Sequence, residues 1–251
     1  MTQDLDGLCK YLPWDTDFFG YRIARILPTT LSQEQAEQID AWCATNEIDC
    51  LYFMAKSNHA ETVRNVEAKD YYHVDVRHVY EINLSKPYAE AHISNELTLD
   101  KATAEDTDSM LPMIDNAFVH TRFYYDPHFT QEQANHLYQT WLIRSIEEDF
   151  ANQVLVARKA GIPQGFITCD LNRDSKIGSI GLIGVAEFAR GQNLGANLVL
   201  SSFAYFAKEG MENIQVVTQG RNIAANRLYQ KCGFRTSEVY LWYHKWFNKS
   251  R

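Results

Sequence analysis

The sequence predicts an α/β protein, because segments with strand periodicity alternate with segments of helical periodicity along most of the chain. The clearest stretch is 179–234, which has the order strand, turn, helix, strand, helix. Its first strand is the apolar run 180–185, and its first helix continues to about Lys208. Residues 1–85 have the order strand, helix, strand, helix, strand. With 45% hydrophobic residues among 251, the chain can bury a core.

The composition excludes several classes of function. A net charge of -8 argues against a nucleic-acid-binding surface, because such surfaces are basic. No window approaches the roughly 18 apolar residues of a membrane span, and the N-terminus has no apolar core of a secretory signal. The five cysteines have no metal-ligand spacing, and their odd number suits a reducing compartment. We therefore expect a cytoplasmic protein with no metal and no membrane or nucleic-acid partner. A homodimer stays open.

The first 90 residues are predicted to form a separate, smaller α/β domain. Three segments have the composition of strands: 21–26, 50–54 and 74–84. The last of them alternates apolar with polar residues, as a strand with one buried face does. Ser32 and Gln35 have the spacing of a capping box, and a second helix runs through Val63 and Val66. We expect domain 1–90 to be a scaffold with a share in the acceptor pocket.

The second predicted domain is 96–251, after a polar linker. Thr103 is an expected N-cap, and Leu111, Ile114 and Phe118 have the spacing of one apolar stripe on the helix that follows it. Four further segments have the composition of strands: 97–99, 154–158, 166–171 and 239–247.

The turn after the apolar run has features of an anion site. Gly191 and Gly195 allow a ligand to approach the backbone closely, and Arg190 adds a positive charge. The first N–H groups of the following helix have no intrahelical partner, and the helix dipole favours an anion there. These residues indicate a pyrophosphate-binding turn. The alternative, in which the glycines serve only the geometry of the turn, stays open.

The last predicted helix begins at Asn222, a good N-cap, and ends before Gly233, a good C′ residue. One of its faces carries four side chains at i, i+3, i+4 and i+7: Ala225, Leu228, Tyr229 and Cys232. From this spacing alone, Tyr229 is a core residue.

The turn and the late helix together resemble the GNAT acyltransferase superfamily. Residues 190–196 resemble its acetyl-CoA motif, Arg/Gln-x-x-Gly-x-Gly/Ala after a strand. Residues 222–234 match its pattern Asn-x-x-Ala-x-x-Leu-Tyr-x-x-x-Gly-Phe at every specified position. Asn193 departs from the motif, since the family has its first glycine there, but asparagine tolerates a left-handed backbone. The resemblance implies the GNAT fold, a mixed, mostly antiparallel twisted sheet with splayed central strands and flanking helices.

The same resemblance implies acetyl-CoA as cosubstrate. The residues that it implies for acetyl-CoA binding are Ile183, Val185, Arg190, Gly191, Gln192, Asn193, Leu194, Gly195, Ala196, Asn222 and Ala225. Tyr229 stands at the position of the family tyrosine that protonates the departing thiolate as general acid. A phenol with a pKa of about 10 stays protonated until the sulfur becomes charged.

The loop 119–130 is rich in residues that bind ligands. In the GNAT architecture, the connection between the first two helices borders the acceptor site. Arg122 can hold a phosphate, and aromatic side chains can stack on a base or cover a sugar. We therefore expect Arg122, Tyr124 and His128 to bind the acceptor. An aromatic-packed surface loop is the alternative.

Short matches outside these motifs resemble GNAT enzymes that acetylate a nucleotide-linked amino-deoxy sugar of the dTDP-4-amino-4,6-dideoxyhexose type, as in polysaccharide and O-antigen biosynthesis. Such enzymes transfer the acetyl group by direct attack of the amine. A protein N-terminal acetyltransferase is an alternative, against which the additional N-terminal half argues. A non-catalytic acyl-CoA-binding protein is another, against which the presence of Tyr229 argues.

Overall fold

The computed structural model describes residues 4–88, 97–115 and 117–247, which form two compact units. Unit 1 comprises Met1–Arg77, Thr121–Thr130 and Val239–Arg251, and unit 2 comprises His78–His120 and Gln131–Glu238. The units therefore alternate along the chain. The predicted division into 1–90 and 96–251 stays a prediction, since its boundary falls on 89–96, outside the described residues.

Unit 1 contains a mixed sheet with the strand order β1-β2-β3-β10-β4. The strands are β1 Cys9–Tyr11, β2 Ile23–Ile26, β3 Cys50–Lys56, the first half of β4 Tyr72–Asn83 and the second half of β10 Arg235–Trp246. The helices are α1 Pro13–Phe19, α2 Gln33–Thr45, α3 Ala60–Glu67 and α5 Arg122–Tyr125. β2 is parallel to β3, whereas β10 runs antiparallel to β3 in the register that pairs Trp246 with Cys50.

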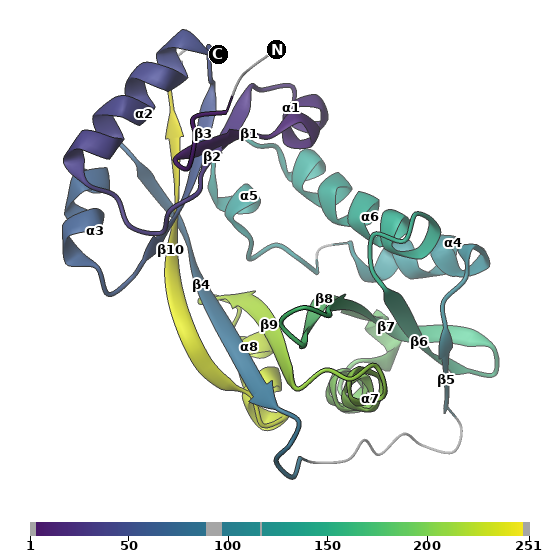
Figure 1. The fold of residues 1–251 in the computed structure, drawn as a ribbon. Coiled ribbons are helices and arrows are strands. Elements are labelled where there is room, and N and C mark those ends of the chain that lie inside the picture. The colour runs from purple at the N-terminus through teal and green to yellow at the C-terminus, as the bar shows by residue number, and fades with distance from the viewer. Residues whose placement is uncertain (1–3, 89–96, 116, 248–251) are drawn as a thin grey trace. The chain divides into compact units, whose positions relative to one another are not determined.

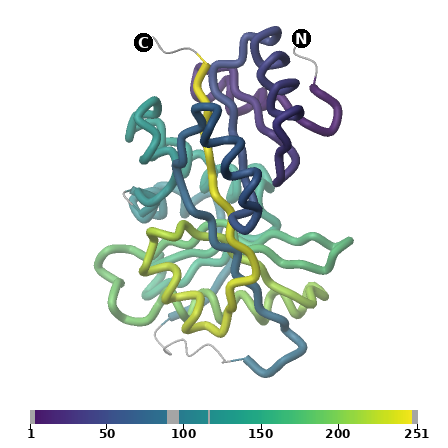
Figure 2. Tube along the Cα trace, turned by 90° about the vertical axis from the view of Figure 1, so that its left-hand side faces the viewer, coloured from purple at the N-terminus to yellow at the C-terminus, as the bar shows by residue number. Residues whose placement is uncertain are grey.

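The two faces of this sheet bury different side chains. α2 and α3 lie on the same face, in front of the strands in Figure 2. That face carries an apolar core that includes Ile39, Phe53, Val66 and Tyr243. Because successive strand residues point to opposite faces, the neighbouring residues of β3 and β10 face the other side, where the ring of Phe123 contacts them.

Most elements predicted for unit 1 are confirmed. The three strands and both helices are present, and the Ser32–Gln35 capping box has both of its hydrogen bonds. β1 and α1 are present but were not predicted from the sequence. The expectation that β4 buries one face is wrong, because the adjacent residues Val74 and Asp75 are both buried. Both faces of the strand are therefore covered at that point.

Unit 2 contains a sheet with the order β4-β9-β8-β7-β6-β5. Its further strands are β5 Leu97–Lys101, β6 Gln153–Lys159, β7 Ile162–Asn172, β8 Ile177–Val185 and β9 Asn213–Gln219. Its α-helices are α4 Thr107–Met110, α6 Gln131–Glu147, α7 Leu194–Lys208 and α8 Ile223–Lys231. The pairs β5–β6, β6–β7 and β7–β8 are antiparallel and β8–β9 is parallel. α7 contacts one face of β6, β7 and β8, and α4 and α6 lie on the other face (Figure 1). The predicted mixed, mostly antiparallel α/β sheet with flanking helices is confirmed.

The local signals in unit 2 are also confirmed, with one exception. The hairpin between β6 and β7 turns at Ala160 and Gly161, both with positive φ, as short hairpin loops require. The helix predicted to carry an inner stripe at Leu111, Ile114 and Phe118 is wrong beyond Met110, where a 3₁₀ turn, Leu111–Met113, replaces it. Pro112 lacks a backbone N–H and disrupts the helix there. None of the described helices is long and apolar enough to cross a membrane.

Candidate active site

Two parallel strands of unit 2 separate along their length. β8 pairs with β9 from Ile177↔Asn213 to Ile180↔Val216, although β8 continues to Val185 and β9 to Gln219. The edge of β8 that faces away from β7 is therefore unpaired from Gly181 onward in the described register. The central strands part as the family resemblance implies, and the unpaired edge of β8 can accept an extended ligand.

A β-bulge starts this separation. Between β7 and β8 the register shifts, so that Gly181 and Leu182 oppose the single residue Thr168. The hydroxyl of Thr168 accepts the N–H of Leu182 at 2.7 Å, which satisfies a backbone donor that the bulge removes from the ladder. A Cβ on Gly181 would lie 2.7 Å from that hydroxyl oxygen, so a larger residue does not fit. Thr168 was not singled out in the sequence, because a bulge has no distinct composition.

The turn predicted to bind pyrophosphate connects β8 to α7. Gly191 and Asn193 have φ values of 78° and 62°, so Asn193 adopts the left-handed backbone that its side chain was expected to tolerate. The side chains of residues 190–193 are exposed, whereas those of Leu194 and Ala196 are buried. The last two can therefore offer a ligand only their backbone N–H groups.

The N-terminus of α7 is suited to an anion. Asn193 is the N-cap, but its side chain makes no capping hydrogen bond and instead accepts from the Nζ of Lys231 at 2.7 Å. The N–H groups of the first turn of α7 thus receive no cap from the side chain of Asn193. Two positive charges lie near them: Arg190 belongs to the turn itself, and Lys231 of α8 contacts Asn193. Lys231 was not among the predicted binding residues.

Gly195 tests whether a pyrophosphate fits this turn. Its φ is not in the left-handed region, and a Cβ built on it would meet nothing closer than a Leu228 methyl at 3.7 Å. Neither the backbone nor the surrounding protein therefore requires glycine at this position. A glycine at such a position is compatible with a ligand that approaches the backbone closely, as a pyrophosphate does at a helix N-terminus.

Several of the other residues predicted to bind acetyl-CoA form hydrogen bonds within the protein. The carbonyl of Val185 accepts the Nε of Arg190 at 3.3 Å, and Gln192 donates to the carbonyl of Phe188 at 3.4 Å. Ile183 lies on the part of β8 whose edge toward β9 is unpaired, and its side chain is half-buried. The side-chain oxygen of Asn222 accepts the N–H of Ala225 at 3.1 Å, so Asn222 caps α8 as predicted.

Tyr229 is buried on the inner face of α8. Its side chain is 4% exposed, and its ring centroid lies 6.1 Å from that of Tyr80 and 5.9 Å from that of Phe234. Burial raises the pKa of Tyr229 well above its usual value, with a smaller contribution from Cys232. The phenol is therefore protonated at every physiological pH. This position agrees equally with a core residue and with a proton donor.

Asn226 fixes α8 to the end of β9. Its amide nitrogen donates to the carbonyls of Gln219 at 2.9 Å and Asn222 at 2.7 Å. Its oxygen accepts from the hydroxyl of Tyr80 at 2.8 Å. Since β9 lines the separation from β8, this buried amide holds the helix that carries Tyr229 at that end of the strand.

The predicted acceptor residues lie in unit 1. The guanidinium of Arg122 lies over three rings, with Cζ 4.2 Å from the ring centroid of Trp242 and 4.5 Å from those of Tyr52 and Phe123. Its Nε is buried without a hydrogen-bond partner. Tyr124, on the same short helix, is half-buried.

His128 is held by its own neighbours. Its Nδ1 lies 2.8 Å from a carboxylate oxygen of Asp126, and its ring stacks on Trp246 at 4.1 Å. The other oxygen of Asp126 accepts from His244 and from Trp246. Asp126 therefore organises this segment, although the sequence analysis did not select it.

Two arginines near Arg122 were also missed. Burial lowers the pKa of Arg25 on β2 and of Arg77 on β4, and the charge of Arg122 lowers both further. They are separated from it and from each other by tens of residues, so no spacing in the sequence links them. Among the described residues, no group of three or more His, Cys, Asp or Glu side chains could hold a metal ion.

Comparison with known proteins matches part of the chain to a family model. Residues 114–234 match the model of the acetyltransferase (GNAT) family. This range includes the bulge, the turn after β8 and the whole of α8.

Two curated relatives are similar at low identity. The chain is 26% identical over 144 residues to the spore coat polysaccharide biosynthesis protein SpsD of Bacillus subtilis, a match of 57% of this chain and 49% of SpsD. It is 24% identical over 170 residues to the dTDP-fucosamine acetyltransferase of Escherichia coli O6:H1, a match of 66% of this chain and 69% of that protein. The match thus spans about half the length of SpsD.

Solved structures share the fold. A GCN5-related N-acetyltransferase from Sphaerobacter thermophilus superposes with a TM-score of 0.66 at 16% identity, covering 95% of this chain and 76% of that one. Residues 114–234 therefore match a GNAT acetyltransferase domain, and the fold of the chain agrees with that match.

Proposed function

We propose that the protein transfers the acetyl group of acetyl-CoA to the amino group of a nucleotide-linked amino-deoxy sugar of the dTDP-4-amino-4,6-dideoxyhexose type. The observation that carries the proposal is the separation of β8 from β9 beyond Ile180. The turn that follows β8 leads into α7, whose N-terminus has no side-chain cap. An open strand edge and an anion-binding turn are the two features that an extended thioester arm with a pyrophosphate needs.

In our proposal, the unpaired edge of β8 near Ile183 binds the arm of the cosubstrate. Gly191, Gly195 and the first N–H groups of α7 hold the pyrophosphate, with Arg190 adding charge. Acetyl-CoA supplies the acetyl group as a thioester. Transfer forms an N–C bond and breaks the C–S bond, while the amine nitrogen loses one proton and the sulfur gains one.

We propose that Tyr229 is the residue that donates a hydrogen bond to the departing sulfur. Burial raises the pKa of Tyr229, which keeps its hydroxyl protonated but makes complete transfer to a thiolate, whose pKa is about 8.5 for an ordinary thiol, unfavourable. Tyr229 therefore acts as a hydrogen-bond donor that stabilises the negative charge developing on sulfur, and the proton that the amine loses reaches the sulfur through water. The hydrogen bonds of Asn226 support the position of its helix.

The acceptor class is supported by the relatives and by unit 1. One relative is a dTDP-fucosamine acetyltransferase and another is a polysaccharide biosynthesis protein. Unit 1 contributes Arg122, whose buried Nε lacks a partner, together with Tyr124 and His128. We propose that these three side chains contact the acceptor.

The test is thiol release from acetyl-CoA with a panel of dTDP- and UDP-amino sugars. A short peptide with a free N-terminus serves as the rival acceptor. Release with an amino sugar and none with the peptide is the expected result. Release only with the peptide would indicate a protein N-terminal acetyltransferase, and acetyl-CoA binding without release for any acceptor would indicate a binding protein.

A further inference from the structure

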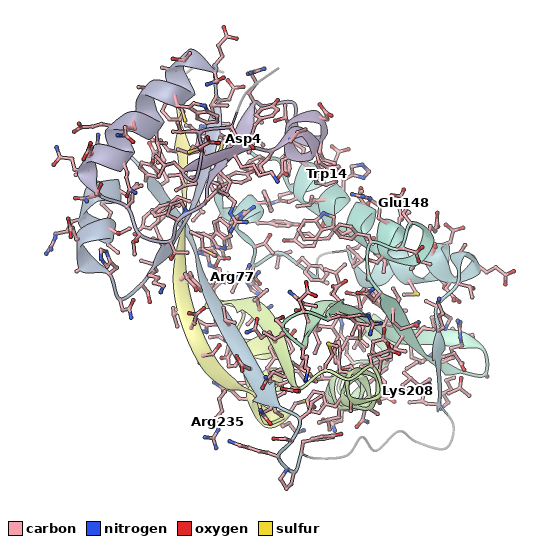
Figure 3. The ribbon with its side chains drawn as sticks, in the orientation of Figure 1. Asp4, Trp14, Arg77, Glu148, Lys208 and Arg235 are labelled. Carbon is pink, nitrogen blue, oxygen red and sulfur yellow. The ribbon has the colours of Figure 1, made fainter. Side chains whose placement is uncertain are left out.

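Three arginines of unit 1, on separate elements, carry charges that act on one another. Arg25 is on β2, Arg77 on β4 (labelled in Figure 3), and Arg122 is the first residue of α5. Arg25 and Arg122 share one aromatic partner, since their Cζ atoms lie 5.4 Å and 4.2 Å from the ring centroid of Trp242. Burial, then the charges of Arg122 and Arg25, lower the pKa of Arg77 to about 10. Arg77 therefore stays charged at neutral pH and is repelled by Arg25 and Arg122.

Among the described residues, no carboxylate is recorded in an ion pair with these guanidiniums, although the charge of Asp75 acts on Arg77. None of the ion pairs between described residues includes Arg25, Arg77 or Arg122. The Nε atoms of Arg25 and Arg122 are buried and have no hydrogen-bond partner. Asp15 interacts with both at longer range, but burial raises its pKa and outweighs their effect. A buried donor without an acceptor, next to uncompensated positive charge, costs stability.

Aromatic packing keeps this arrangement rigid. The rings of Tyr52, Phe123 and Trp242 surround the guanidinium of Arg122, and cation–π attraction holds it in place. A fixed guanidinium loses less entropy on binding, and its planar set of N–H donors matches a phosphate group.

We infer that Arg25, Arg77 and Arg122 form a second anion site, within unit 1, that binds the diphosphate group of the acceptor nucleotide. A diphosphate supplies the negative charge and the acceptor oxygens that this cluster lacks. The assignment of this anion to the acceptor rests on the proposed function. The turn proposed to bind the pyrophosphate of acetyl-CoA belongs to unit 2.

Calorimetry on the full chain tests the site without turnover. The probes are dTDP, inorganic pyrophosphate, thymidine and acetyl-CoA, and the variants are Arg25→Gln and Arg77→Gln. Arg64→Gln, at an exposed position of α3, is the matched control. Each test variant should raise the dissociation constant of dTDP about tenfold, as expected for the loss of a charge-assisted hydrogen bond. Arg64→Gln should not change it, and acetyl-CoA should bind all variants equally.

The other probes separate the phosphate from the base. Pyrophosphate should compete with dTDP, and thymidine should not bind measurably. Equal affinity for thymidine and dTDP, or dTDP binding unchanged in both variants, would overturn the inference. Removal of one of three like charges should also leave the unfolding temperature unchanged or higher, and a clear fall would mean that the arginines only support the fold.

The outcomes for the site and for the reaction are distinct. Arginine-dependent dTDP binding without acetyl transfer would support the site and refute the proposed function. Acetyl transfer with an unchanged acceptor KM in both variants would refute the site and leave the function standing.

Discussion

The carboxylate of Asp126 accepts a 2.6 Å hydrogen bond from Nδ1 of His244, whose side chain is completely buried. Burial, partly offset by this hydrogen bond, lowers the pKa of His244 to about 4. The folded protein therefore keeps His244 neutral at pH values where an unfolded histidine, with a pKa of about 6.5, is protonated.

This pair predicts a pH dependence of stability. Because the folded pKa is depressed, the stabilisation is complete above about pH 6.5 and is lost as the pH falls toward about 4. At 1.36 kcal/mol per unit of pKa, the loss in free energy of unfolding reaches about 3 kcal/mol. His244→Gln should flatten the pH profile between these limits in urea unfolding. The exposed His136→Gln should keep the wild-type slope, and an equal slope in all three proteins would contradict this account.

Substitution of Gly195 by aspartate should have opposite effects on the stability of the fold and on acetyl-CoA affinity. Gly195→Ala should fold normally, since its Cβ meets only ordinary contacts from 3.7 Å. Gly195→Asp places a carboxylate in the first turn of α7, where the helix dipole stabilises it by about 0.3–1 kcal/mol. The same carboxylate repels a pyrophosphate, so acetyl-CoA affinity should fall strongly while the unfolding temperature holds or rises. Wild-type affinity by calorimetry would refute the placement of the pyrophosphate.

Substitution of Arg122 should weaken binding of the acceptor and leave binding of acetyl-CoA unchanged. Arg122→Met keeps most of the packing against Tyr52 and Trp242 and removes the charge. The acceptor KM should rise about tenfold, as for a lost charge-assisted hydrogen bond, with acetyl-CoA affinity unchanged. Arg122→Lys, which retains charge without the planar donors, should show a smaller rise. Equal losses for both substrates would mean that Arg122 only supports the fold.

Tyr229→Phe separates catalysis from packing. The variant keeps the ring between Tyr80 and Phe234 and removes only the hydroxyl. We expect kcat to fall about 100-fold with acetyl-CoA affinity preserved. Because the pKa of Tyr229 is raised, wild-type kcat should show no loss from its ionisation up to pH 10. A variant that turns over within about threefold of wild type would return Tyr229 to the role of a core residue.

The sequence predicted features that depend on neighbouring residues. The caps at Ser32 and Asn222 follow from side chains within a few positions of the backbone groups that they satisfy. The left-handed backbone of Asn193 follows from the tolerance of asparagine for positive φ. The strand pattern likewise predicted β7 and β8, and the resemblance predicted that the central strands part.

Features that join distant segments were not predicted. The grouping of residues 121–130 with β10 depends on Asp126, which binds His244 and Trp246 more than a hundred residues later. The bulge at Gly181 depends on a hydroxyl from the neighbouring strand. Arg25, Arg77 and Arg122 lie on β2, β4 and α5, so their relationship depends on the tertiary structure.

The most direct test of the central claim is a coupled measurement of thiol release and product mass. Purified wild-type protein is incubated with acetyl-CoA and a dTDP-4-amino-4,6-dideoxyhexose, with the corresponding 4-hydroxy sugar nucleotide as control. We predict one thiol released for each N-acetylated sugar nucleotide formed, and no release with the hydroxy sugar. Absence of the acetylated amino sugar, in a protein that binds acetyl-CoA, would contradict the account.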